Sequence, residues 1–85
     1  MAYFVYILES RKDGTFYVGS TSHLSDRIDR HNQGRSKYTK AKRPWNLIYH
    51  EEHPDRSSAV LREKEIKARK SKEYIERLVR ASRLT

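Results

Sequence analysis

The hydrophobic positions of this chain fall first into three short runs with the composition of β-strands. Residues 3–9 and 16–19 are dominated by aromatic and β-branched side chains, and residues 45–50 form a third such run. Asp13-Gly14 lies between the first two runs, and glycine readily adopts the left-handed dihedrals of a tight hairpin turn. The pattern therefore predicts an antiparallel hairpin, with the third strand extending the same sheet.

Between the second and third runs, apolar positions recur with the spacing of a helix. Leu24, Ile28 and His31 fall at i, i+4 and i+7, and Gly34 follows as a residue that commonly ends helices. This predicts a short helix. The residues after it, 35–43, show no clear period and carry a dense positive charge.

The last third of the chain predicts two further helices. One is expected to start within residues 54–58 and to run to about residue 69. Ser71 can cap the other, a C-terminal helix over about residues 71–84. The order β-β-α-β-α-α predicts an α+β fold, a small three-stranded antiparallel sheet flanked by helices, in a single domain over residues 1–85.

Tyr6 and Tyr17 lie on the two strands of the predicted hairpin. Side chains alternate between the faces of a sheet, so any hairpin loop of even length puts both tyrosines on one face. A two-residue loop at Asp13-Gly14 would offset them along the strands, whereas a four-residue loop over residues 10–13 would set them opposite each other. We favour the wider loop.

Size and composition limit the classes of protein to consider. The chain has 85 residues, 35% of them hydrophobic and 35% charged, which fits one small domain with a thin core. It has no cysteine, so it forms neither disulfides nor thiolate metal sites, and no run approaches the roughly 20 apolar residues of a membrane span. The N-terminus also lacks the pattern of a signal peptide. We therefore expect a cytoplasmic protein without membrane contact.

The charge balance points to a polyanionic partner. Lysine and arginine number 19 against 11 aspartates and glutamates, a formal net charge of +8. Basic surfaces bind nucleic acid strongly because binding releases condensed counterions. Nucleic acid is therefore the expected partner, with a domain whose charge serves only solubility as the simpler alternative.

Several side chains have the chemistry that phosphodiester hydrolysis requires. A divalent ion can neutralise phosphate charge as a Lewis acid, and Mg²⁺ can be held by one carboxylate and several waters, so Glu63 is the candidate ligand. Arg27 has the planar fork that matches phosphate oxygens, and His31 lies one helical turn further on. A tyrosine close to a metal ion and an arginine is shifted toward the phenolate, which can accept a proton from water.

Each of these residues, taken alone, has a simpler explanation. Tyr6 and Tyr17 fit as packing residues of the sheet, and Arg27 fits as a solvated charge. Glu63 fits as an i,i+4 partner of Lys67, and His31 can cover the end of its helix. Their joint occurrence in this order outweighs the separate explanations.

With these residues in place, the chain resembles the GIY-YIG endonuclease superfamily, most closely its small stand-alone bacterial members. Phe4-Val5-Tyr6 and Tyr17-Val18-Gly19 correspond to the two motifs that name the superfamily. The other matching segments are residues 24–27, 31–32, 43–49, 59–63 and 66–67, so the resemblance covers about residues 3–70. Phe4, Val5 and Val18 replace the usual residues of the naming motifs but retain strand character.

The resemblance implies a one-metal endonuclease mechanism. By position, Tyr6 and Tyr17 would orient and deprotonate the attacking water, and Arg27 would stabilise the phosphate. His31 would assist proton transfer, and Glu63 would hold Mg²⁺ or Mn²⁺. Many members of the superfamily carry separate DNA-targeting domains, and this sequence shows none. Substrate choice is therefore expected to come from the domain surface, from a protein partner or from oligomerisation.

A basic stretch that runs from the first helix to the start of the third strand is the expected nucleic-acid surface. Its cations could follow a phosphate backbone while Tyr38 stacks on an unpaired base, and Asn32, Ser36 and Thr39 add neutral donors. The basic side chains of this stretch are Arg27, Arg30, Arg35, Lys37, Lys40, Lys42 and Arg43.

The leading hypothesis is a Mg²⁺- or Mn²⁺-dependent endonuclease acting on DNA rather than RNA, on a structured, damaged or single-stranded form, in DNA repair or recombination. A nucleic-acid-binding module with an idle site is the alternative, and a protein-interaction adaptor is a third. The run His50-Glu51-Glu52-His53 is not interpreted as a metal site, because it lacks the helical His-Glu-x-x-His spacing.

Overall fold

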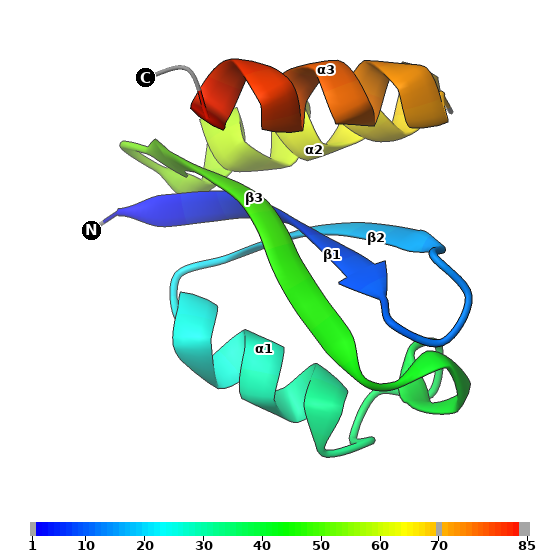
Figure 1. Cartoon of the computed structure of the whole chain (residues 1–85). Coiled ribbons are helices and arrows are strands. Elements are labelled where there is room, and N and C mark those ends of the chain that lie inside the picture. Colours follow the sequence, from blue (N-terminus) through cyan, green and yellow to red (C-terminus); the bar gives the residue numbers. More distant parts are fainter. Residues whose placement is uncertain (1, 70, 84–85) are drawn as a thin grey trace.

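A computed structural model describes residues 2–69 and 71–83 of the chain (Figure 1). It confirms the predicted α+β fold, with a single antiparallel sheet and the order β-β-α-β-α-α, to which a short 3₁₀ helix, η1, is added before the third strand. The elements are β1 (Tyr3–Ser10), β2 (Phe16–Thr21), α1 (Leu24–Asn32), η1 (Lys40–Lys42), β3 (Trp45–His53), α2 (Arg56–Arg69) and α3 (Lys72–Arg83). The expected end of the last helix, residue 84, lies outside the described residues.

Strand β1 lies at the centre of the sheet, whose strand order is β2-β1-β3. Helix α1 covers one face of the sheet, whereas α2 and α3 cover the other (Figure 1). A strand covered on both faces must be apolar at every position, and Val5, Tyr6, Ile7 and Leu8 are accordingly all buried. Strand β2 lies at one end of the strand order, so it is an edge strand that is open on one side.

The alternation of side chains along β1 divides the core in two. Val5 and Ile7 join Ala59 and Ile66 of α2 on one face, together with Ile75 of α3. On the other face, Tyr6 and Leu8 form a cluster with Trp45, and Tyr17, Leu24, Ile28 and Leu47 pack against it. Both tyrosines of the predicted site thus lie on the face that α1 covers.

The hairpin register differs from the expected one by a shift of the loop. The backbone amide of Ser10 donates to the Thr15 carbonyl at 2.8 Å, so the four-residue loop spans 11–14 instead of 10–13. Tyr6 consequently pairs with Gly19, and Tyr17 pairs with Leu8. The two phenols share a face but lie diagonally, with ring centroids 6.3 Å apart, so the expectation that they lie opposite each other is wrong.

Hydrogen bonds of one serine explain this shift. The Ser10 hydroxyl donates to the carbonyl of Lys42 at 2.7 Å and accepts the backbone amides of Lys12 and Asp13 at 3.1 and 3.3 Å. These contacts hold Ser10 at the end of the strand, and Gly14, with φ of 78°, takes the left-handed position in the loop. The anchor at Lys42 lies far along the chain, so the local turn signal could not reveal it.

Among the described helices, none is long and apolar enough to cross a membrane. The serine predicted to cap the last helix does so, because the Ser71 hydroxyl accepts the backbone amide of Tyr74 at 3.2 Å.

Candidate active site

The hydroxyl of Tyr6 reaches the open edge of the sheet by passing over Gly19. Tyr6 pairs directly with Gly19 across the two strands. A Cβ at position 19 would lie 2.5 Å from Tyr6 Oη and 2.7 Å from its Cζ, closer than side-chain carbons approach. The glycine of the Tyr17-Val18-Gly19 run is therefore needed so that the phenol can lie across β2.

Tyr6 shares a buried hydrogen bond with His31 of α1. Tyr6 Oη lies 3.1 Å from His31 Nε2, and His31 Nδ1 lies 2.8 Å from the hydroxyl of Thr39. All three residues are at most 2% exposed. Burial lowers the pKa of the His31 ring below its ordinary value, and the nearby Arg27 and Arg30 lower it further. The ring is therefore neutral near pH 7, with one donor nitrogen and one acceptor nitrogen.

Burial also determines the protonation of Tyr6. It raises the pKa of the Tyr6 hydroxyl well above the ordinary value, and the neighbouring Tyr17 and Glu63 act in the same direction. Arg27 lowers the pKa, as the sequence suggested, but burial outweighs it. The resting form of Tyr6 is thus the phenol, and the shift toward the phenolate beside a metal ion stays a prediction.

Tyr17 lies beside this pair through its ring. Its ring centroid is 4.8 Å from that of His31 and 6.2 Å from that of Trp45, whose contact is edge-on. The ring is half-buried. Tyr17 therefore packs against the imidazole of His31 and helps to fix its plane.

A polar cleft of about 540 Å³ opens along the edge strand β2, between residues of α1 and α2. Arg27 lines it, so the guanidinium predicted to bind phosphate does face a hollow that can hold one. Glu63 lines the same cleft from α2. The full lining is Tyr3, Ser20, Thr21, Ser22, His23, Asp26, Arg27, Arg30, Arg56, Val60 and Glu63.

Glu63 reaches the cleft because of its position on α2. Ala59 and Ile66, four residues before and three after it, are buried against the sheet, so Glu63 lies on the same side of the helix. Its Oε1 accepts a hydrogen bond from the Ser20 hydroxyl at 2.6 Å, and its Oε2 pairs with Lys67 Nζ at 2.6 Å. The side chain remains 19% exposed, so further lone pairs face the cleft.

This donor set suits a hard divalent ion with few protein ligands. The described part of the chain holds no group of three or more metal-ligating side chains, which zinc would favour. Glu63 offers a carboxylate and Ser20 a hydroxyl oxygen at the wall of an open cleft. Mg²⁺ and Mn²⁺ accept such oxygen ligands, and Mg²⁺ retains much of its water shell.

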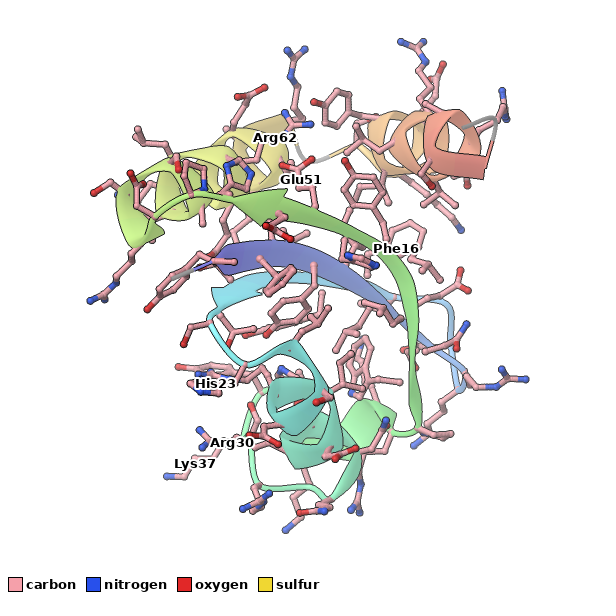
Figure 2. The ribbon with its side chains drawn as sticks, turned by 90° about the vertical axis from the view of Figure 1, so that its left-hand side faces the viewer. Phe16, His23, Arg30, Lys37, Glu51 and Arg62 are labelled. Carbon is pink, nitrogen blue, oxygen red and sulfur yellow. The ribbon has the colours of Figure 1, made fainter. Side chains whose placement is uncertain are left out.

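The predicted nucleic-acid residues divide into exposed and structural ones. Tyr38 is 91% exposed and Arg30 lines the cleft. Figure 2 shows Arg30 and Lys37 projecting on the same side of the molecule as His23, so the basic surface continues beyond the cleft. Arg35 and Lys40 are also exposed.

Other residues of this set have structural partners. Lys42 forms an ion pair with Asp13 at 3.0 Å, and Arg43 donates to the Lys40 carbonyl at 3.0 Å. The amide of Asn32 donates to the Trp45 carbonyl at 3.1 Å and accepts its backbone amide at 2.6 Å. Asn32 therefore attaches the end of α1 to the start of β3.

Sequence reasoning did not identify Ser20, Gly19 or Thr39 as parts of the site. We expected Thr39 as a surface donor, but it is buried against His31. Its position in an irregular basic loop gave no signal of burial. Ser20 follows Val18 by two residues on the same face, and only the placement of α2 brings Glu63 to it.

Comparisons with known proteins agree with this fold. The family model described as the GIY-YIG catalytic domain matches residues 2–76. UPF0213 proteins from Staphylococcus aureus strains Mu50 and N315 are each 42% identical over 67 residues, which cover 78% of this chain and 80% of theirs. The solution NMR structure of UPF0213 protein BH0048 from Bacillus halodurans matches 95% of this chain and 85% of that one, with a TM-score of 0.60 and 35% identity.

A GIY-YIG domain implies nuclease-type activity on nucleic acid, and nucleases of this type usually use divalent metals. The two tyrosines lie on β1 and β2, Arg27 and His31 lie on α1, and Glu63 lies on α2. With the family model spanning most of its length, the chain belongs to the GIY-YIG catalytic domain family.

Proposed function

We propose that this protein is a Mg²⁺- or Mn²⁺-dependent endonuclease that hydrolyses phosphodiester bonds in DNA. The observation that carries the proposal is one polar cleft lined by Arg27 and Glu63. Ser20 donates to Glu63 at its wall and follows Gly19, over which the hydroxyl of the Tyr6–His31 pair lies. The charges of Arg27 and Glu63 act on the Tyr6 hydroxyl in opposite directions, because Arg27 lowers its pKa and Glu63 raises it.

Each side chain has a distinct part in the proposed reaction. Tyr6 orients the attacking water. As the water attacks phosphorus, the Tyr6 hydroxyl passes its own proton to a phosphate oxygen, and the Tyr6 oxygen takes the proton of the water. His31 supports Tyr6 through the hydrogen bond at 3.1 Å. The hydroxyl of Tyr17, whose ring packs on the imidazole of His31, helps Tyr6 to orient the same water.

Arg27 acts on the phosphate, and Glu63 acts on the divalent ion that would balance the phosphate charge. The guanidinium of Arg27 binds phosphate oxygens in a bidentate manner and stabilises the negative charge that grows on them. A divalent ion held by Glu63 would act as a Lewis acid toward the phosphate and the leaving oxygen. Ser20 and Lys67 keep the carboxylate aimed at the cleft through their two short contacts.

The surface around the cleft supports nucleic acid as the substrate, and we propose DNA over RNA, in a structured, damaged or single-stranded form. Arg30, Lys37 and Tyr38 would hold the backbone and an unpaired base, with Arg35 and Lys40 near them. We further propose that the chain acts as one nuclease domain in the cytoplasm of a bacterium, in repair or recombination, with a protein partner supplying targeting.

A cleavage assay tests the proposal. Purified protein is incubated with labelled duplexes, flaps, forks, loops and single strands, with Mg²⁺, Mn²⁺ or EDTA, beside the variants Glu63→Gln and Tyr17→Phe. We expect metal-dependent cleavage that falls by about 100-fold or more in Glu63→Gln. Activity that neither variant reduces would refute the assigned roles, and salt-dependent binding without any cleavage would identify an idle binding module.

A further inference from the structure

Thr39 is a buried residue in an exposed basic loop. It is 1% exposed, whereas its neighbours Tyr38 and Lys40 are exposed. The Thr39 carbonyl accepts a hydrogen bond from Trp45 Nε1 at 2.9 Å, and Asn32 in turn holds both backbone groups of Trp45. These contacts fix the loop so that one hydroxyl points inward.

Within the described residues, the Thr39 hydroxyl has one partner, His31 Nδ1 at 2.8 Å, and His31 Nε2 faces Tyr6 Oη at 3.1 Å. Two proton arrangements fit this row. In one, Tyr6 donates to Nε2 and Nδ1–H donates to Thr39, so the Thr39 proton has no acceptor. In the other, Thr39 donates to Nδ1 and Nε2–H donates to Tyr6, so the Tyr6 proton is free.

The surroundings of the two hydroxyls distinguish these arrangements, because Tyr6 and Thr39 are equally buried, each 1% exposed. A buried donor without an acceptor is costly, and Thr39 is enclosed by the protein. The Tyr6 hydroxyl instead lies over Gly19 of the edge strand, next in the chain to Ser20, which lines the cleft although Tyr6 itself does not. The charges of Arg27 and Glu63 act on this hydroxyl. A free proton there can be accepted by water or by a phosphate oxygen. The second arrangement is therefore favoured.

We propose that Thr39 is a positioning residue that fixes His31 as the Nε2–H tautomer, so that His31 donates to the Tyr6 oxygen and the Tyr6 hydroxyl faces the cleft. The consequence for catalysis rests on the proposed nuclease function, whereas the tautomer does not. A donor at Nε2 stabilises the negative charge that grows on the Tyr6 oxygen as its hydroxyl proton passes to a phosphate oxygen, and the same oxygen then takes the proton of the attacking water. The loop that would present Tyr38 and Lys40 to nucleic acid thus also fixes the proton arrangement between Tyr6 and His31.

The test combines NMR with kinetics on the full chain. Long-range ¹H–¹⁵N correlation at a pH where the ring is neutral shows which nitrogen of His31 carries the proton. We expect Nε2–H in the wild type and in Thr39→Ser. In Thr39→Val, which has nearly the same shape but no hydroxyl, we expect a mixture of tautomers and a kcat about five- to tenfold lower at unchanged KM.

Ser10→Ala is the matched control. It removes another buried hydroxyl that anchors the same loop, through the Lys42 carbonyl, without contacting His31. We expect it to retain the Nε2–H tautomer and kcat, because the pairing of β1 with both β2 and β3 still holds the register that places Tyr6 over Gly19.

Three results would overturn the role of Thr39: a wild-type proton on Nδ1, a Thr39→Val chain with unchanged tautomer and kcat, or equal effects in Ser10→Ala. A wild type that cleaves no substrate yet shows Nε2–H would refute the proposed nuclease and support this assignment of the tautomer.

Discussion

At the scale of single residues, the site depends on a contact that only glycine allows. Tyr6 is nearly fully buried, so its ring cannot swing away from a new side chain at position 19 without losing the hydrogen bond to His31. The second glycine with a structural role, Gly14, differs because nothing lies within 4 Å of its missing Cβ. The two positions therefore separate steric effects from backbone effects.

Gly19→Ala is expected to reduce cleavage by about 10-fold or more and to cost about 1–3 kcal/mol of stability, because the new methyl group overlaps Tyr6 Oη. Gly14→Ala is the control. The positive φ at position 14 strains an alanine there by about 1–2 kcal/mol, yet the variant should cleave normally. Cleavage rates and urea unfolding of both variants measure this. Normal cleavage in Gly19→Ala would contradict the placement of the phenol.

His31 gives a pH dependence of stability. The folded chain lowers the pKa of its ring below the ordinary 6.5, so the unfolded chain binds the proton first as the pH falls. The contribution of the neutral His31 ring to the free energy of unfolding is therefore present in full above pH 6.5 and is lost progressively at lower pH. The carboxyl groups of Glu51 and Asp55, whose pKa values are lowered from 4.5 and 3.8, cause a further loss of stability as the pH falls below those values.

Urea unfolding of the wild type between about pH 7 and 5 should show this loss, and His31→Gln, which does not titrate, should flatten the slope. An equal slope in both proteins would show that burial of His31 does not supply the effect.

At the scale of elements, the site forms where side chains from both faces of the sheet meet around the open edge of β2. Tyr6 and His31 come from the face under α1, whereas Ser20 and Glu63 come from the face under α2. A central strand would separate these groups by backbone. The edge position explains how residues on opposite layers can serve one cleft.

On the far side of the sheet, Arg62 joins three elements. It donates to Glu51 of β3 at 2.8 Å, to Glu65 at 2.8 Å and to the Tyr74 hydroxyl of α3 at 3.2 Å (Figure 2). The Glu51 carboxylate also accepts the Tyr49 hydroxyl, and burial raises the pKa of Tyr49 to about 12. This network secures α2, the helix that carries Glu63.

Glu51→Gln is expected to lower the free energy of unfolding by about 1–3 kcal/mol, because it weakens a partly buried charged network. Cleavage under folding conditions should remain near normal, because Glu51 does not line the cleft. Thermal unfolding and the cleavage rate are the measurements. A large loss of rate in a folded variant would place the network in the reaction.

The elements were predictable from sequence because their signals are local. Period-two and helical patterns placed the strands and α1, and Ser71 correctly predicted the cap of α3. The hairpin shift and the burial of Thr39 were not predictable, because both depend on contacts between distant segments, through Ser10 and His31. The order of candidate residues followed from the sequence, but their contacts with Ser20 and Gly19 did not.

At the scale of the whole molecule, the net charge of +8 is distributed unevenly. Arg27, Arg30 and Arg56 line the cleft, and Lys37 continues the basic surface on the side shown in Figure 2. On α3, by contrast, Arg77 is paired with Glu73 at 2.8 Å. Nucleic acid should therefore bind on the side of the cleft and leave α3 free.

Lys37→Ala should lower affinity for oligonucleotides and reduce the slope of log affinity against log salt by about 1. Arg77→Ala, an equal change of charge on α3, should leave the slope unchanged. Anisotropy titrations at several salt concentrations measure both. Equal slopes for the two variants would show that binding follows net charge and not this surface.

The most direct test of the central claim, that Tyr6 and Glu63 serve one reaction centre, is a double-mutant cycle of the single-turnover cleavage rate with Tyr6→Phe and Glu63→Gln. Residues that act as a unit have strongly non-additive effects. We predict that the double variant is about as slow as the slower single variant. Independent effects that multiply would contradict the account.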